Sequence, residues 1–500
     1  MNSERKYSTP NRQVIAKTSL LIALGCVLGI AVYFISDKEM RWVLMPGLAL
    51  VSVIFILVVP QKKRVLTAIF VLSFQVDIYL RFLYGHSGTN DGLALPLVVA
   101  TGGLLIGWYY FSGQMRNFSW GGSMRRPISA WLIILAISTI ASSERFVGLC
   151  AFVYVIEYYF LYWTAFNIVR TPDDFKRLII LLMTVLGIQA LVYFAQSAMG
   201  ITFDFLGNTI EKGEVARPGG TVSPNPAGYV SFITPALMMA SAIALSKYRR
   251  VLIPYSIPLM LMGIAAVGLS FTRAAWIGLI FGFAAIIFIG LRHRWLNFRM
   301  VIIVLVVLGL GVATLLPTML DRVSSDYQGG KGSATDETLN ERMGLNKIAL
   351  NVIVHNPIVG VGPGAYPYEF RAYVPAGLNQ WLYTVHNVYL LWAAETGIFG
   401  GLVFVWWLFA GFGIALRLAR SPPSLISICA TGWFGAMIIL SWMMFWVPWI
   451  GFSYNAMFWF MLGLMDAAQR LVVADSTGKR TRTELVSRDF ARLNSTSVSQ

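Results

Sequence analysis

Long apolar runs alternate with short polar, mostly basic segments along almost the whole chain. A helix needs roughly 20 apolar residues to cross a hydrocarbon core about 30 Å thick, so this pattern predicts about fourteen membrane-spanning helices. The expected spans are residues 18–36, 42–60, 65–84, 92–112, 127–142, 146–169, 178–199, 227–246, 251–271, 274–291, 300–317, 387–416, 425–446 and 449–468. The sequence therefore predicts an all-α protein, a polytopic membrane helical bundle.

Composition and charge agree with a membrane protein. The 500 residues are 57% hydrophobic and 12% charged, whereas soluble domains carry about 25% charged residues. The chain has 39 Lys+Arg against 23 Asp+Glu, and most of this excess falls in alternate loops, as expected of cytoplasmic segments. Both termini are therefore predicted to be cytoplasmic. The basic excess is assigned to topology and to contact with membrane lipid, and no nucleic-acid binding is expected.

Two predicted outer loops, residues 201–226 and 318–385, are much longer than the others, and loops of this length are usually functional or disordered. The second is expected to carry a helix that starts near Asp336 and lies on the membrane interface or on the spans. Its apolar face recurs at three- and four-residue spacing. The residues of this face are Leu345, Ile348, Ala349, Val352 and Ile353. The glycine-rich run 357–364 is expected to end the helix.

Several common chemistries are excluded by their missing motifs. The sequence has no G-x-x-x-x-G-K-[ST] phosphate-binding loop, and its four histidines and three cysteines form no metal-ligand pattern. We therefore expect no metal and no cofactor. The acidic pair Asp173–Asp174 follows Thr171 and Pro172 and is expected to start a helix.

Glu157 and Glu395 lie inside predicted spans, where an ionisable group costs about 2.5–3.5 kcal/mol. Glu157 lies among three tyrosines, Tyr158, Tyr159 and Tyr162, whose hydroxyls could satisfy it, and structural and functional roles remain equally open. Glu395 is followed by Gly397, Gly400 and Gly401, a pattern typical of close packing against a neighbouring helix. We expect Glu395 to be a buried hydrogen-bond anchor.

Three other polar residues fall at the same predicted outer face. Arg217 lies in the first long outer loop, Arg273 at the tip of a hairpin between two spans, and His386 where the second long loop meets the next span. A guanidinium group can bind two phosphate oxygens at once. A neutral imidazole can take a proton from a hydroxyl. The combination fits transfer from a lipid-pyrophosphate-linked glycan.

Four segments carry a family resemblance. Residues 386–401 (HNVYLLWAAETGIFGG) strongly resemble the H-N-x-[YF]-L-x(4)-E-x-G-x-x-G signature of the bacterial O-antigen ligase/polymerase family. Arg342 with residues 355–364 (HNPIVGVGPG) resembles the segment before this signature. Residues 271–278 (FTRAAWIG) resemble the arginine hairpin of the family, with Thr272 where serine is usual, and residues 217–226 (RPGGTVSPNP) resemble its arginine loop more loosely.

The resemblance implies a metal-independent, inverting membrane glycosyltransferase of the C type (GT-C-like) in the bacterial inner membrane. Its donor would be an undecaprenyl-diphosphate-linked glycan at the periplasmic face. Arg217 and Arg273 would hold the diphosphate, Arg342 would assist, and His386 would activate the acceptor hydroxyl. His355 is expected to be a turn or cap residue.

On this reading the chain divides into four parts. They are a cytoplasmic N-tail (1–17), N-terminal membrane helices (18–199), an O-antigen ligase-like core (200–471) with a periplasmic loop carrying short helices (318–386), and a disordered C-tail (472–500).

The acceptor stays open, because ligases use lipid A–core whereas polymerases of the same family extend a growing O-antigen or exopolysaccharide glycan. A lipid-linked oligosaccharide flippase is the more distant alternative. Such transporters usually show internal repeats and midplane sites, which this sequence does not.

Overall fold

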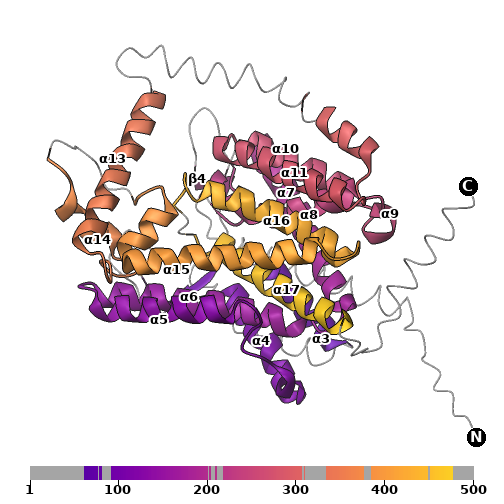
Figure 1. Ribbon diagram of the computed structural model, residues 1–500, viewed down its shortest axis with the longest axis horizontal. Coiled ribbons are helices and arrows are strands. Elements are labelled where there is room, and N and C mark those ends of the chain that lie inside the picture. Colours follow the sequence, from indigo (N-terminus) through magenta and orange to yellow (C-terminus); the bar gives the residue numbers. More distant parts are fainter. Residues whose placement is uncertain are drawn as a thin grey trace, which may run out of the picture. The chain divides into compact units, whose positions relative to one another are not determined.

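The computed structural model (Figure 1) describes residues 61–306 apart from 77, 82–91, 201, 204–208, 211–217 and 224, and residues 309, 334–376, 384–448 and 451–476. Contacts divide the chain into two units, residues 1–70 and residues 71–500. The elements below lie in the second unit, except that α3 (Lys62–Ser73) begins in the first.

Helices make up most of the described chain. They are α4 (Leu97–Phe111), η1 (Gln114–Asn117), α5 (Arg125–Ala141), α6 (Arg145–Ile168), α7 (Pro172–Met199), α8 (Pro226–Leu245), α9 (Arg249–Leu252), α10 (Ser256–Leu269), α11 (Arg273–Arg292), α13 (Ala334–His355), α14 (Tyr366–Glu369), η2 (Phe370–Tyr373), α15 (Val388–Ala419), α16 (Leu425–Met443) and α17 (Phe452–Ser476). The strands of the described residues form two short antiparallel pairs. These are β1 (Tyr79–Arg81) with β2 (Ala94–Pro96), and β3 (Thr202–Phe203) with β4 (Thr209–Ile210).

Seven of the described helices are long and apolar enough to cross a membrane. They are α6, α7, α8, α11, α15, α16 and residues 452–474 of α17. The prediction of a multi-pass helical membrane protein is therefore confirmed. The first two expected spans, 18–36 and 42–60, lie outside the described residues, as does most of the eleventh, which is helical from 298 to 306.

Two expected spans differ from the structure. The third was expected over residues 65–84, but α3 ends at Ser73 and Tyr79–Arg81 pair with a strand, because a short apolar run does not distinguish helix from strand. The ninth, expected over 251–271, is broken into α9 and α10. Ile253 precedes a proline and is extended, with φ −150° and ψ 98°, as the proline ring disfavours helical geometry for the residue before it.

The centre of the bundle is α8, every residue of which is buried. It packs against α7, α10, α11, α16 and α17. A Cβ added at Gly432 of α16 would lie 2.5 Å from the Met238 carbonyl oxygen, so glycine is needed where α16 crosses α8. In Figure 1, α15 runs between α5 and α16, in agreement with its packing against both.

The expected helix of the long loop is confirmed as α13. Its predicted apolar face, from Leu345 to Ile353, is buried in a cluster with Tyr366, Phe370 and residues of α15. α13 therefore lies against a membrane-span helix with this face.

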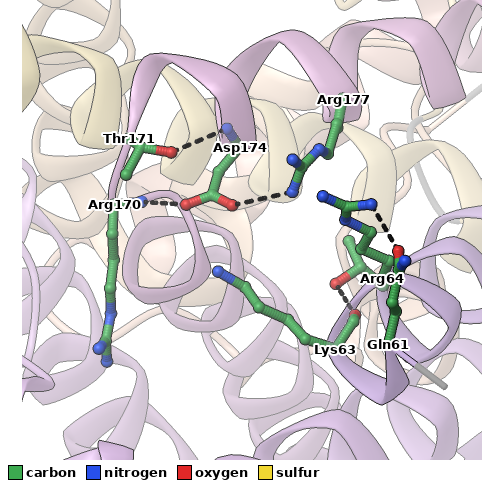
Figure 2. A network of polar contacts seen from close by, with 8 residues as sticks. Gln61, Lys63, Arg64, Arg170, Thr171, Asp174 and Arg177 are labelled. Carbon is green, nitrogen blue, oxygen red and sulfur yellow. Dashed lines mark hydrogen bonds and ion pairs between the residues drawn. The ribbon is translucent and has the colours of Figure 1, made fainter. Parts of the chain in front are cut away.

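The start of α7 is also as predicted (Figure 2). The Thr171 hydroxyl accepts a hydrogen bond from the Asp174 amide at 3.1 Å, and Pro172 occupies the first turn. The Asp174 carboxylate in turn accepts from the Arg170 amide at 3.3 Å and lies 3.8 Å from the Arg177 guanidinium. Thr171 caps the helix and the acidic pair lies in its first turn, so the helix starts as expected.

The two ends of the bundle can be identified from helix directions. α15 and α17 run the same way, because Trp407 contacts Phe458 and Gly411 faces Leu462. α11 and α16 run in opposite directions, because Gly278 lies against Ile439 whereas Gly435 lies against Gly282 and Ile286.

Gly228 in the first turn of α8 faces Tyr454 in the first turn of α17. The starts of α8, α11, α15 and α17 and the end of α16 therefore share one end, which we call the arginine end because α11 begins there at Arg273.

The opposite end is held by Asp466 of α17, which is 2% exposed. Its carboxylate accepts hydrogen bonds from the amides of Ser123 (3.0 Å) and Met124 (3.2 Å), directly before α5, and from the Tyr162 hydroxyl (2.6 Å). One turn later, Arg470 donates to the carbonyls of Phe166 and Val169 at the end of α6. α17 thereby caps one helix start and one helix end with side chains of opposite charge, as helix dipoles favour.

Candidate active site

Arg273 is fixed by a tight hairpin at the arginine end. α10 ends at Leu269 and α11 begins at Arg273, and Phe271 between them has φ +52°. The Ser270 hydroxyl bonds the Thr272 hydroxyl at 3.1 Å, and the Trp276 indole donates to the Val267 carbonyl at 3.1 Å. The hairpin therefore holds the arginine at the first position of a membrane-span helix.

Arg342 comes from α13. The buried face of that helix fixes it on the bundle, and the Arg342 guanidinium lies 6.0 Å from the centroid of the Trp446 ring, just beyond the end of α16. An arginine over an aromatic face gains about 0.5–2 kcal/mol. Burial and the neighbouring positive charge of Arg273 lower the pKa of Arg342, whereas Glu341 acts in the opposite direction.

His386 lies directly before α15. Asn387 caps this helix by accepting from the amides of Tyr389 (3.1 Å) and Leu390 (3.2 Å), and the Val388 amide donates to the Met444 carbonyl at 2.8 Å. Nδ1 of His386 is buried and has no hydrogen-bond partner among the described residues. The backbone directly after His386 is therefore fixed, while Nδ1 of its imidazole has an unmet hydrogen-bonding capacity.

Arg342 is coupled through charge to both His386 and Arg273. Burial, followed by the positive charge of Arg342, lowers the pKa of His386, while the Thr384 backbone and the Glu341 carboxylate act in the opposite direction. Arg273 lowers the pKa of Arg342 in the same way. Residues from three segments that are far apart in the sequence thus converge at the arginine end.

Arg217 lies outside the described residues. The loop that follows it is anchored to α7, because the Gln196 side chain both donates to the Gly220 carbonyl (2.9 Å) and accepts from its amide (3.0 Å). The Gln189 amide donates to the Thr221 hydroxyl at 2.6 Å. Gly220 has φ +65°, and a Cβ there would lie 2.6 Å from Gln189 Oε1.

Asn225 then caps α8. The residues after Arg217 therefore lead into the arginine end, while the position of Arg217 itself stays a prediction.

α15 is broken ten residues into its length. Gly397 has φ +76° and ψ 175°, and a Cβ there would lie 2.2 Å from the Ile358 carbonyl oxygen. The glycines after Glu395 were expected to pack against a neighbouring helix. Gly400 does so, next to Ile134 of α5, but Gly397 serves a different purpose, because it opens the helix to the 357–364 loop.

Glu395 is a buried hydrogen-bond anchor, as expected. Its carboxyl is 5% exposed and is hydrogen-bonded to the backbone of Gly364 and Tyr366. The expectation for Glu157 was wrong in part: Tyr159 donates to the Trp120 carbonyl and Tyr162 to Asp466. Oε2 of Glu157 is buried without a hydrogen-bond partner in the described part of the chain.

His355 is the last residue of α13, and its Nδ1 lies 2.8 Å from the Asn351 carbonyl oxygen. This agrees with the expected cap or turn position. Within the described residues no group of three His, Cys, Asp or Glu side chains is arranged to hold a metal.

Sequence reasoning missed two members of the site, Glu341 and Trp446. Glu341 is adjacent to Arg342 and could have been considered with it, whereas nothing in the sequence around Trp446 separates it from the other tryptophans of the same apolar stretch.

Residues 227–405 match the family model described as O-antigen ligase, and no curated protein matches the chain. The matched segment begins in α8 and ends after the break in α15, so it contains Arg273, Arg342 and His386. The resemblance that the motifs indicated is thus confirmed for residues 227–405 of this multi-pass membrane protein, which match the O-antigen ligase family.

Proposed function

We propose that the protein transfers a glycan from undecaprenyl diphosphate to an acceptor hydroxyl at the periplasmic face of the inner membrane. The observation that carries this proposal is the convergence of Arg273, Arg342 and His386 at one end of the helices, where the charge of Arg342 is coupled to both other residues. The match of residues 227–405 to the O-antigen ligase family supports the general class of reaction.

Each residue has a distinct role in the proposed reaction. Arg273, with Arg217 and with help from Arg342, binds the diphosphate and stabilises the negative charge that develops on it as the bond to the sugar breaks. His386 takes the proton from the acceptor hydroxyl while that oxygen forms the new glycosidic bond. The diphosphate leaves on its lipid, so the transfer is balanced without metal or nucleotide.

The lowered pKa of His386 suits a base. Burial and Arg342 favour the neutral imidazole, which is the form able to accept a proton at neutral pH. Arginine is suited to binding the negatively charged diphosphate, because it keeps its positive charge even when burial lowers its pKa.

The test uses purified protein in detergent or liposomes with an undecaprenyl-diphosphate-linked oligosaccharide and lipid A–core. We expect transfer in EDTA without nucleotide, and loss of transfer in His386→Ala and Arg273→Ala variants that still insert and elute as folded protein. His355→Ala is the matched control, since this histidine is exposed at the end of α13 and its loss should leave transfer unchanged.

The product identifies the acceptor. Glycan on lipid A–core shows a ligase, whereas longer lipid-linked glycan shows a polymerase of O-antigen or exopolysaccharide type. Movement of the donor between leaflets without bond cleavage would show a flippase and would overturn the proposal.

A further inference from the structure

The break in α15 is filled by backbone from the 357–364 loop. The amide of Ile398 donates to the Pro357 carbonyl (2.9 Å), while the carbonyls of Ala394 and Glu395 accept from the amides of Val361 (3.0 Å) and Gly362 (2.9 Å). The loop thus takes over hydrogen bonds that an unbroken helix would make within itself. We call the broken part of α15 and residues 357–364 the joint.

The joint permits little movement. A Cβ at Gly360 would lie 2.2 Å from the Glu395 carbonyl carbon, so the two backbones are in direct contact. The Ser138 hydroxyl of α5 lies 2.6 Å from the Val359 carbonyl oxygen and 2.8 Å from that of Glu395. The Glu395 carboxyl completes the joint through the backbone of Gly364 and Tyr366.

The joint lies between two proposed site residues. The loop immediately follows α13, which carries Arg342, and α15 begins two residues after His386. The buried cluster beneath α13 includes Leu391 and Ala394 of α15 together with Tyr366, so the same few residues hold both helices.

Resting on the proposed function, we infer that Glu395 is a positioning residue that fixes Arg342 relative to His386. The Glu395 carboxyl bonds the backbone at the end of the 357–364 loop. Because this loop follows α13, Glu395 fixes how α13 packs against α15. Glu395 reaches neither the acceptor nor the diphosphate. It acts through the two residues proposed to do so.

One readout of this role does not depend on turnover. The charged groups acting on His386 are Arg342 and Glu341 of α13, and Arg342 lowers the pKa of His386. If α13 shifts, this effect weakens. The pKa of His386 can be followed by NMR of histidine-labelled full-length protein in detergent, with His386→Gln used to assign its signal.

We expect Glu395→Gln, which preserves side-chain shape but presents an amide to backbone donors, to raise the pKa of His386 and to lower kcat/KM for the lipid-linked donor by about tenfold or more. Arg342→Gln gives the reference direction for the pKa. Glu369→Gln is the matched control, because this carboxylate in α14 bonds Ser143 and not the joint, and it should change neither quantity.

An unchanged His386 pKa in folded Glu395→Gln overturns the inference, whether or not transfer is lost. If that variant does not fold, Ser138→Ala decides by the same two measurements, because it removes the hydroxyl bridging both sides of the joint. If the wild type shows no transfer, the proposed function fails, while the titration still decides whether Glu395 positions α13.

Discussion

The Arg342 guanidinium and the His386 imidazole, on segments more than forty positions apart in the sequence, are close enough that the arginine's charge lowers the pKa of the histidine. This relationship joins α13 to the start of α15. It also makes the protonation of His386 depend on a residue outside the signature at residues 386–401.

Neutralising Arg342 should shift the pH dependence of transfer. The pKa of His386 is lowered by burial and by Arg342, so removing that charge in Arg342→Gln raises it, and the imidazole becomes protonated and inactive as a base at a higher pH. We therefore expect the acid limb of a kcat/KM profile to move to higher pH than in the wild type. An acid limb that stays in place or moves to lower pH contradicts the charge coupling.

Arg273 should not be replaceable by lysine. A lysine retains the charge but lacks the planar fork that binds two phosphate oxygens, and losing one charge-assisted hydrogen bond costs about 1.5–3 kcal/mol, or roughly 10- to 150-fold in rate. We expect Arg273→Lys to keep weak transfer and Arg273→Ala to have none, measured as kcat/KM for the donor. Equal activity of Arg273→Lys and the wild type would argue against bidentate binding.

Asp466 should be among the most sensitive positions for stability at the end opposite the arginine end. It accepts two amides and the Tyr162 hydroxyl while almost fully buried, and leaving such donors unpaired costs about 1–3 kcal/mol each. Asp466→Ala should lower Tm by several degrees in detergent, measured by intrinsic fluorescence. Tyr159→Phe, which removes an exposed hydroxyl bond to Trp120, is the control and should shift Tm much less.

Gly397 and Gly103 should respond oppositely to the same substitution. Gly397→Ala places a Cβ 2.2 Å from the Ile358 carbonyl oxygen at φ +76°, so we expect loss of folded protein in size-exclusion chromatography. Gly103 lies within α4 with no heavy atom within 4 Å of an added Cβ. Alanine there should be neutral or stabilise the helix by up to about 1 kcal/mol.

The sequence predicted those parts of the molecule that depend on local patterns. The apolar face of α13, the Thr171 cap of α7 and most helix bounds follow from spacing and capping residues, and these rules act within a few turns. The grouping of Arg273 with His386 at one end also followed, because the basic loops alternate along the chain.

The features that were not predicted depend on tertiary contacts. In the sequence, the glycine at the break, Gly397, cannot be distinguished from a glycine that packs against a neighbouring helix. Only the structure shows that Gly397 has φ +76°. Tyr162 and Glu157 are within two turns of each other, yet the hydroxyl bonds Asp466 from α17. Only the packing of α6 on α17 decides this choice, and Trp446 joins the site for the same reason.

The complete enclosure of α8 separates it from the other long helices. Phe288 and Ile280 of α11 are exposed and are available to acyl chains, whereas α8 has no exposed residue. Its apolar sequence is therefore constrained by protein neighbours rather than by the bilayer. We expect a photoreactive phospholipid to label α11 and to leave α8 unmodified. A change in lipid composition would therefore affect α8 and the loop before it only indirectly, through the helices that surround α8.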